Sequence, residues 1–247
     1  MTLEQDVAWL LREKYNGEKT KGFFADCERL QNGEPVAYVI GHQPFLDVQI
    51  DLDSKPLIPR PETEWWTKLA IEHITKNGTP RVLDLCAGSG AIGVATLKAV
   101  PTAQIDFAEM DVTHHGTIVN NICDNGTDYT RTRVFGGDLF SEIPTGTTYD
   151  FILSNPPYID PALNRAEASV KIFEPHLALY GGVHGMEIIE QILKDALAYL
   201  AEAGELWIEH EPEQAERINS LARELGYRTC ETMRDQFGVL RVSRILV

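Results

Sequence analysis

Apolar and polar residues follow two different periodicities along the chain, and the change between them indicates the order of helices and strands. Residues 3–11 repeat apolar side chains at helical spacing, and Thr2 with Gln5 has the form of a capping box. A short β-prone run between glycine and proline residues follows at Gly33–Gly41, and Phe45–Leu52 alternates apolar and polar residues. These patterns predict an amphipathic helix followed by a small β-hairpin.

From residue 81 onward, short apolar runs alternate with longer amphipathic stretches. The apolar runs predict five strands: Val82–Leu85, Gln104–Ala108, Arg133–Phe135, Tyr149–Ser154 and Glu205–Glu209. The stretches between and after them predict four helices: Ala91–Ala99, His114–Asp124, Met186–Ala201 and Glu213–Leu225. The β-prone C-terminal segment, Phe237–Val247, predicts a further, antiparallel strand. Alternating strands and helices predict an α/β fold, a doubly wound parallel sheet with helices on both faces.

The charge balance excludes some classes of function. The chain has 247 residues with 22 Lys and Arg against 37 Asp and Glu, a net charge of -15. Proteins that bind a phosphate backbone unaided carry the opposite charge, so we expect no direct contact with nucleic acid. No apolar run is long enough to predict a membrane span, so we expect no membrane association. The four cysteines form no C-x-x-C pair, which predicts reduced thiols, and no set of residues has the spacing of a metal site.

A glycine-rich turn follows the first strand of the predicted sheet. Gly88, Gly90 and Gly93 spell G-x-G-x-x-G, and Asp111 lies near the end of the next strand, so a nicotinamide dinucleotide is one candidate ligand. Asp84, just before the turn, is expected to face the mouth of the site. Its carboxylate would repel a pyrophosphate and attract an ammonium group such as that of S-adenosylmethionine. The loop therefore favours an adenosyl ligand with an amino-acid end.

A second motif, Asn155-Pro-Pro-Tyr158, follows the strand predicted at Tyr149–Ser154. Two prolines fix the backbone and remove two N–H donors, which leaves carbonyl acceptors where open α/β sheets bind ligands. The side-chain oxygen of Asn155 and the carbonyl of Pro156 could each accept one N–H of a planar amide or amino group, and the Tyr158 ring could lie against its plane. The tetrapeptide therefore predicts a site for a planar –NH2 nucleophile.

These motifs and their order resemble the protein-(glutamine-N5) methyltransferases that act on peptide-chain release factors. The resemblance runs from about residue 33 to residue 247. It is carried by five segments: Gly33–Gly41, Leu57-Ile-Pro-Arg-Pro-Glu-Thr-Glu64, Asp84–Gly93, Asn155–Tyr158, and Glu174–Gly182 followed by Gly185. The tetrapeptide alone is shared with adenine-N6 and guanine-N2 methyltransferases, whereas the segment ending at Glu64 is more specific.

The resemblance implies a seven-stranded, Rossmann-like, S-adenosylmethionine-dependent methyltransferase fold. It implies transfer of a methyl group to the side-chain nitrogen (N5) of a glutamine, most simply that of the Gly-Gly-Gln motif of a release factor, by a monomer. The expected cofactor-binding residues are Asp84, Cys86, Ala87, Gly88, Ser89, Gly90, Asp111, Asp138, Leu139 and Asn155. The expected catalytic and substrate-binding residues are Asn155, Pro156, Pro157 and Tyr158, with Arg60, Glu62 and Glu64 near the entrance.

Two features depart from the family pattern. We expect a helix and hairpin extension over residues 1–64 and a methyltransferase domain over 65–247, which makes the N-terminal part shorter than is usual in the family. The Glu-x-Gly-x-x-Gln pattern appears here as Glu209-His-Glu-Pro-Glu-Gln214, without the glycine. Cys86 stands where many bacterial members have glycine, a form associated with mitochondrial-type relatives, so both the cytoplasm and the mitochondrial matrix are expected locations.

Three other interpretations remain open at this point. The same tetrapeptide could serve a nucleic-acid amino-methyltransferase acting on a flipped base. The chain could be a partner subunit that binds the cofactor without activity, and the nicotinamide enzyme is the third alternative. Arg60, Glu62 and Glu64 could instead form an ion-pair network that braces the hairpin against the sheet.

Overall fold

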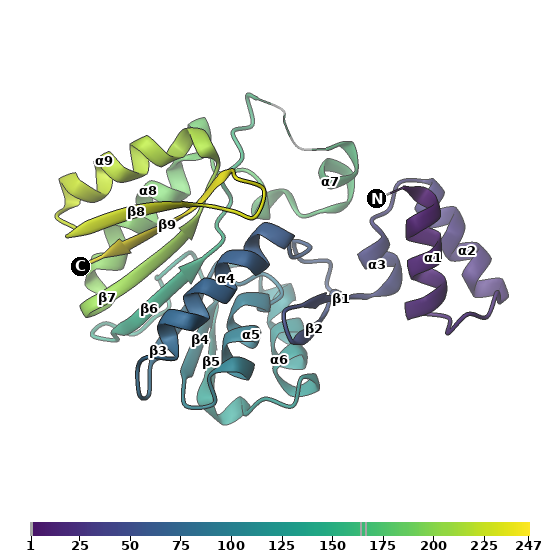
Figure 1. The fold of residues 1–247 in the computed structure, drawn as a ribbon, viewed down its shortest axis with the longest axis horizontal. Coiled ribbons are helices and arrows are strands. Elements are labelled where there is room, and N and C mark those ends of the chain that lie inside the picture. Colours follow the sequence, from purple (N-terminus) through teal and green to yellow (C-terminus); the bar gives the residue numbers. More distant parts are fainter. Residues whose placement is uncertain (1, 164, 166) are drawn as a thin grey trace.

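The N-terminal region of the computed structural model, which describes residues 2–163, 165 and 167–247, is a cluster of helices set beside the sheet (Figure 1). Its three helices are α1 (Leu3–Glu13), α2 (Lys21–Gln31) and α3 (Val36–Ile40). They bury a small apolar cluster of their own around Leu10 and Phe23. The predicted capping box is confirmed, because Thr2 and Gln5 exchange side-chain to backbone hydrogen bonds at the start of α1.

The predicted hairpin is confirmed in position, but the strand predicted over Gly33–Gly41 is wrong. The hairpin consists of β1 (His42–Phe45) and β2 (Val48–Asp51). The preceding residues form α3, which begins after Pro35 and ends at Gly41 with a φ of 101°. All five residues of α3 are buried. Tertiary packing therefore overrides the β propensity of this valine-rich and isoleucine-rich run.

A seven-stranded sheet forms the centre of the molecule. Its strands are β3 (Arg81–Leu85), β4 (Gln104–Ala108), β5 (Thr132–Phe135), β6 (Tyr149–Ser154), β7 (Leu200–Glu209), β8 (Thr229–Arg234) and β9 (Leu240–Leu246). The spatial order is β5-β4-β3-β6-β7-β9-β8, in which the first five strands are parallel and β9 is antiparallel to both neighbours. The predicted parallel sheet and antiparallel C-terminal strand are confirmed. The edge strand β8 was not predicted.

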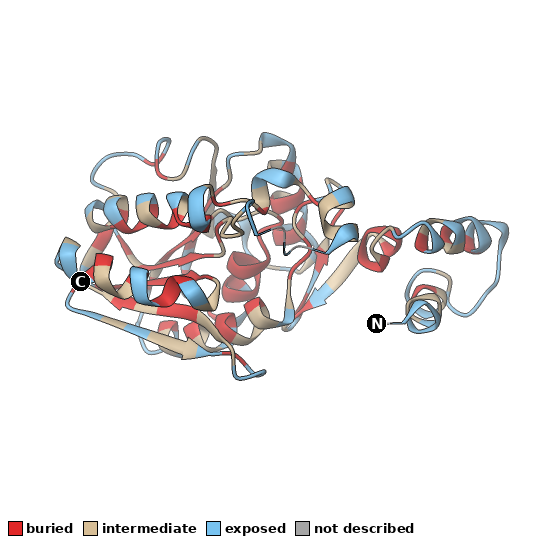
Figure 2. Cartoon of the chain, turned by 90° about the horizontal axis from the view of Figure 1, so that it is seen from above, coloured by how far each residue is buried: buried red, intermediate tan, exposed pale blue. Residues whose placement is uncertain are grey.

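Helices cover both faces of this sheet, as predicted (Figures 1 and 2). One face carries α4 (Pro61–Ile74), α5 (Ala91–Ala99) and α6 (His115–Asp124), and the other carries α8 (Glu187–Asp195) and α9 (Ala215–Leu225). Successive residues of a strand serve opposite faces: Val82 packs with the first group and Leu83 with the second. Within the described part of the chain, no helix combines the length and apolar character needed to cross a membrane.

Several boundaries differ from the predicted ones. The helix predicted over Met186–Ala201 ends at Asp195, because Leu200 already pairs with Tyr149 as the first residue of β7. The expected division after residue 64 falls inside α4, and the separation of the chain into two units stays a prediction. Short helical segments occupy the connections: α7 (Ala168–Phe173), η1 (Val112–His114), η2 (Tyr129–Arg131), η3 (His176–Ala178), η4 (Val183–Gly185), η5 (Ala196–Ala198) and η6 (Pro212–Gln214).

Gly93 of α5 lies directly against Phe107 of β4, which predicts the effect of a substitution there. A Cβ atom on Gly93 would lie 2.3 Å from Cε1 of Phe107, a fully buried side chain of β4. We expect Gly93→Ala to lower the free energy of unfolding by about 1–3 kcal/mol, because overpacking outweighs the better helix propensity of alanine. Urea unfolding followed by circular dichroism measures the change.

Gly116→Ala in α6 is the matched control, since a Cβ there meets no atom within 4 Å. That variant should retain or slightly raise the stability of the protein. A Gly93→Ala variant as stable as Gly116→Ala would contradict the packing account.

Candidate active site

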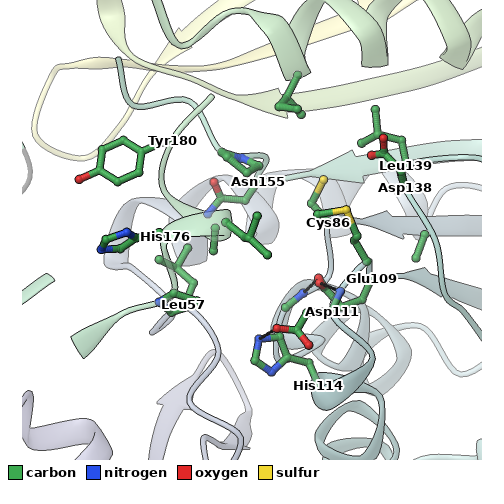
Figure 3. A pocket seen from close by; sticks show the side chains of 18 residues that line it. Leu57, Cys86, Glu109, Asp111, His114, Asp138, Leu139, Asn155, His176 and Tyr180 are labelled. Carbon is green, nitrogen blue, oxygen red and sulfur yellow. Dashed lines mark hydrogen bonds and ion pairs between the residues drawn. The ribbon is translucent and has the colours of Figure 1, made fainter. Parts of the chain in front are cut away.

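A cavity of about 330 Å³ lies where β3, β4 and β6 end. The carboxyl ends of parallel strands meet at one edge of a sheet, which is where open α/β folds bind ligands. Seven of the predicted site residues line it: Cys86, Gly88, Asp111, Asp138, Leu139, Asn155 and Pro157. Figure 3 shows Leu57, His176 and Tyr180 on one side of the cavity, and Asp138 with Leu139 on the other. The sequence thus identified residues from four separate connections that the fold brings together.

The glycine turn between β3 and α5 presents its backbone to the cavity. Cys86, Gly88 and Gly90 all have positive φ, at 61°, 54° and 77°. A Cβ on Gly88 would meet nothing within 4 Å, so open space lies beside its backbone. The turn is held by hydrogen bonds from the N–H of Ala87 to the carbonyl of Ala108 and from Gly90 to Ala87. Burial raises the pKa of the Cys86 thiol, which keeps it neutral.

Asp84 lies beneath this turn and not at the mouth of the cavity where the sequence placed it. Its side chain is fully buried, and Oδ2 accepts a hydrogen bond of 2.8 Å from the N–H of Gly93. In the part of the chain that the structure describes, Oδ1 has no hydrogen-bond partner. Burial raises the pKa of Asp84 to about 8. The carboxyl group of Asp84 therefore fixes the first turn of α5 at the expense of its own solvation.

Glu109 is a site residue that the sequence analysis missed. It follows β4 directly, lines the cavity, and accepts hydrogen bonds from the N–H of Gly88 (2.7 Å) and of Asp111 (2.8 Å). Asp111, the predicted acid, also lines the cavity, but its Oδ1 caps η1 by accepting from Thr113. These hydrogen bonds lower the pKa of Asp111. The signal that could have identified Glu109 is its position as the first residue after the apolar run Gln104–Ala108.

Other predicted cofactor residues lie behind or beside the cavity wall. Ala87, Ser89 and Gly90 belong to the turn but do not line the cavity. Ser89 is buried, and its carbonyl accepts a hydrogen bond of 2.9 Å from Nδ2 of Asn121 in α6. These three residues shape the turn through their backbone. Asp138 with Leu139, by contrast, forms part of the cavity wall after β5.

The Asn155–Tyr158 tetrapeptide is fixed by polar contacts at both ends. Asn155 is half-buried at the cavity wall, and its Nδ2 donates to Oγ1 of Thr63 at 3.2 Å. Pro156 is buried and Pro157 lines the cavity. The hydroxyl of Tyr158 donates to Oε1 of Glu209 at 2.9 Å, and burial raises the pKa of this tyrosine well above its usual value. Tyr158 is therefore a half-buried, neutral hydrogen-bond donor whose hydroxyl is directed at the buried Glu209.

The first and last residues of the Glu209–Gln214 segment both contact Tyr158. Glu209 accepts a hydrogen bond from the Tyr158 hydroxyl, and Nε2 of Gln214 donates to the Tyr158 carbonyl at 2.8 Å. The same Nε2 also donates to the carbonyl of His184. In the sequence, this segment stands out only because it departs from the Glu-x-Gly-x-x-Gln pattern. Its structural role is to hold the tetrapeptide.

Arg60, Glu62 and Glu64 do not line the cavity. Nη2 of Arg60 lies 2.5 Å from Oε1 of Glu174, which precedes the cavity residue Pro175. Glu64 accepts a hydrogen bond of 2.6 Å from the N–H of Leu46 in the hairpin turn. Glu64 thus ties the hairpin to α4, whereas Arg60 pairs with Glu174, which belongs to neither the hairpin nor the sheet. Glu62 lies partly exposed at the start of α4.

Solved structures with a similar fold include methyltransferases. A methyltransferase from Pyrococcus furiosus matches with a TM-score of 0.59 at 17% identity, over 89% of this chain and 95% of that one. A Thermus thermophilus 16S rRNA N2 G1207 methyltransferase, in complex with AdoMet and guanosine, matches with a TM-score of 0.59 at 14% identity, over 83% of this chain and 49% of that one. The family described as the methyltransferase small domain matches residues 63–178. The predicted Rossmann-like methyltransferase fold is confirmed.

Relatives of higher identity define the family more narrowly. A release factor glutamine methyltransferase of Bordetella pertussis is 34% identical over 85% of this chain and 77% of its own length. Enzymes of the same name from Aliivibrio fischeri and Streptococcus pneumoniae are each 32% identical, over 92% and 96% of this chain and 78% and 84% of their own lengths. The chain belongs to the release factor glutamine methyltransferase family, as the motifs predicted.

The burial of Asp84 predicts a pH-dependent stability. The unfolded chain releases the proton of this carboxyl group near pH 4, whereas the folded chain keeps it to about pH 8, so the folded state binds more protons between these values. Asp84 therefore makes the protein less stable as pH rises from 4 to 8. We expect Asp84→Asn to gain stability relative to the wild type over this range, by roughly 2–5 kcal/mol in total. Thermal unfolding of both proteins without ligand, at pH 5, 6.5 and 8, checks this; a difference that is constant with pH would contradict it.

Proposed function

We propose that this protein transfers a methyl group from S-adenosylmethionine to the side-chain nitrogen (N5) of a glutamine in a peptide-chain release factor, the glutamine of its Gly-Gly-Gln motif. The observation that carries the proposal is the position of the Asn155 amide, half-buried in the same cavity as the glycine turn. Membership of the family supports it, since the relatives carry the name of this activity.

The residues at the cavity suit the proposed cofactor. The open space beside Gly88 admits a ligand against the backbone of the turn, as a side chain at this position would not. The Glu109 carboxylate keeps lone pairs beyond those used by its two backbone donors, and hydroxyl groups of a ribose are suitable donors to them. Asp138 and Leu139 form the wall that would border an adenine. When bound, S-adenosylmethionine supplies an electrophilic methyl group on a positively charged sulfur.

The tetrapeptide would overcome the poor nucleophilicity of an amide nitrogen by positioning it. The lone pair of that nitrogen is delocalised into the carbonyl, so it needs a fixed approach to the methyl carbon. Oδ1 of Asn155 and the carbonyl of Pro156 would accept its two N–H groups, which holds the nitrogen in place and stabilises the positive charge that develops on it. One of these protons then leaves to solvent, and the methylated amide is neutral. The reaction thus requires no dedicated base.

The proposal is tested by incubating the protein with a purified release factor and methyl-labelled S-adenosylmethionine. Mass spectrometry of the peptide that contains Gly-Gly-Gln should locate one added methyl group on the glutamine. Label in nucleic acid and not in the release factor would favour the amino-methyltransferase of bases. Cofactor binding without transfer to any release factor would favour the partner subunit. The net charge of -15 argues against the nucleic-acid substrate.

Substitution of Asn155 should separate catalysis from cofactor binding. In Asn155→Ala the glutamine loses one acceptor, so we expect methyl transfer to fall about 100-fold. The affinity for S-adenosylhomocysteine, measured by calorimetry, should stay within about threefold of the wild type. In Asn155→Asp an anionic acceptor replaces the neutral amide, and transfer to the glutamine should also fall. Transfer by Asn155→Ala within twofold of the wild-type rate would overturn the proposed role.

Glu109 and Asp111 should differ in their effect on cofactor affinity. Glu109 lies directly at the end of β4 and also anchors Gly88, so Glu109→Ala removes a ligand contact and a support of the turn. Because a hydrogen bond to a charged group contributes roughly 1.5–3 kcal/mol, we expect affinity to fall at least tenfold. Asp111→Ala should weaken binding less, since that carboxylate is already engaged by Thr113. Calorimetry with S-adenosylmethionine that ranks the two variants in the opposite order would be evidence for Asp111 as the principal acid.

A further inference from the structure

A fully buried carboxylate links the tetrapeptide to α4. Glu209, the last residue of β7, accepts three hydrogen bonds: from Oγ1 of Thr63 (2.7 Å), from Nε1 of Trp66 (2.6 Å) and from the hydroxyl of Tyr158 (2.9 Å). Thr63 is 3% exposed and Trp66 is 0% exposed. A carboxylate with three donors is adequately satisfied in the interior, although burial still raises the pKa of Glu209.

The register of the sheet and the period of α4 bring Glu209 and its hydrogen-bond donors together. Ser154 of β6 lies opposite Ile208 of β7, so the next residues along the two parallel strands, Asn155 and Glu209, end side by side. Thr63 and Trp66 are three residues apart in α4 and therefore share the helix face that covers this point. The proposed glutamine site and the buried carboxylate are thus adjacent, with Thr63 between them.

The donors and acceptors of this chain leave one arrangement for the Asn155 amide. A threonine hydroxyl has one hydrogen, and a carboxylate accepts only, so the Thr63 hydrogen points to Glu209. Towards Asn155 the Thr63 oxygen then has only lone pairs, and the group 3.2 Å away must be the NH2 donor. The other end of the same planar amide, Oδ1, is thereby turned away from Thr63.

We propose that Thr63, whose hydroxyl is oriented by Glu209, is a positioning residue that keeps the acceptor oxygen of Asn155 directed at the substrate. This inference rests on the proposed function, because the direction matters only for a substrate that donates an N–H. Without the hydrogen bonds from Thr63 to Glu209 and from Asn155 to Thr63, the Asn155 amide is free to rotate by half a turn. It would then present its NH2, a donor, to a substrate group that is itself a donor. The flipped amide repels the substrate that it is meant to hold.

Two substitutions at Thr63 separate this role from simple packing. Thr63→Val keeps the shape and loses the hydroxyl, whereas Thr63→Ser loses a methyl group and keeps the hydroxyl. If Thr63 positions Asn155, kcat for methylation of the release factor should fall about 10- to 100-fold in Thr63→Val and less than about threefold in Thr63→Ser. In both variants the affinity for S-adenosylhomocysteine should stay within about twofold. If Thr63 only fills space, valine will be the better replacement, and that order of rates overturns the inference.

A measurement without turnover keeps this inference distinguishable from the proposed function. In protein labelled with 15N-asparagine, the side-chain NH2 signal of Asn155 is assigned by its loss in Asn155→Ala. Its hydrogen exchange should be slowed in the wild type and in Thr63→Ser, and faster in Thr63→Val. Unchanged exchange in Thr63→Val would overturn the orientation, even where methylation is confirmed. Absence of methylation by the wild type, with the expected exchange pattern, would instead refute the release-factor substrate and leave the orientation intact.

Discussion

The site depends on the parallel register of the four central strands. β4, β3, β6 and β7 run in the same direction, so their carboxyl ends reach one edge of the sheet and the residues that follow them lie next to each other. Each strand supplies one chemical component there: the glycine turn after β3, Glu109 after β4, Asn155 after β6 and Glu209 at the end of β7. A shift of one strand by a single residue would move each of its side chains to the opposite face of the sheet, and the site residues would no longer lie next to each other.

Two acidic side chains, Glu209 and Asp84, are buried behind this edge of the sheet and differ in how far hydrogen bonds compensate their lost hydration. Glu209 is surrounded by three donors, from two residues of α4 and from Tyr158, so its charge is compensated by oriented hydrogen bonds. Asp84 has one backbone donor and an oxygen without a partner in the part of the chain that the structure describes. The first arrangement orients neighbouring groups. The second ties the glycine turn to the first turn of α5 and makes the stability of that contact sensitive to pH.

The sequence predicted the elements and site residues that a local pattern marks. It did not predict those whose conformation or position depends on tertiary packing. Apolar runs identified β3, β4 and β6, because a strand buried on both faces has little polar content. The short α3 was misassigned because its β-prone residues are held by α1 and α2, which lie up to some thirty residues away in the chain. Asn155 and the glycine turn were found from their motifs and positions. Thr63 carried no signal of its own, since only the folded chain places it between Asn155 and Glu209.

The two halves of the site are held by different sets of hydrogen bonds. The cavity wall formed by the glycine turn and Glu109 is anchored to β3, β4 and α5 through backbone hydrogen bonds. The tetrapeptide is anchored to α4, to β7 and to Gln214 through hydrogen bonds that involve side chains. Because each half has its own hydrogen-bond partners, a change in the partners of one half need not break the hydrogen bonds of the other. The architecture thus allows cofactor affinity and substrate orientation to be adjusted separately, which is what a reaction between a small cofactor and a large protein substrate requires.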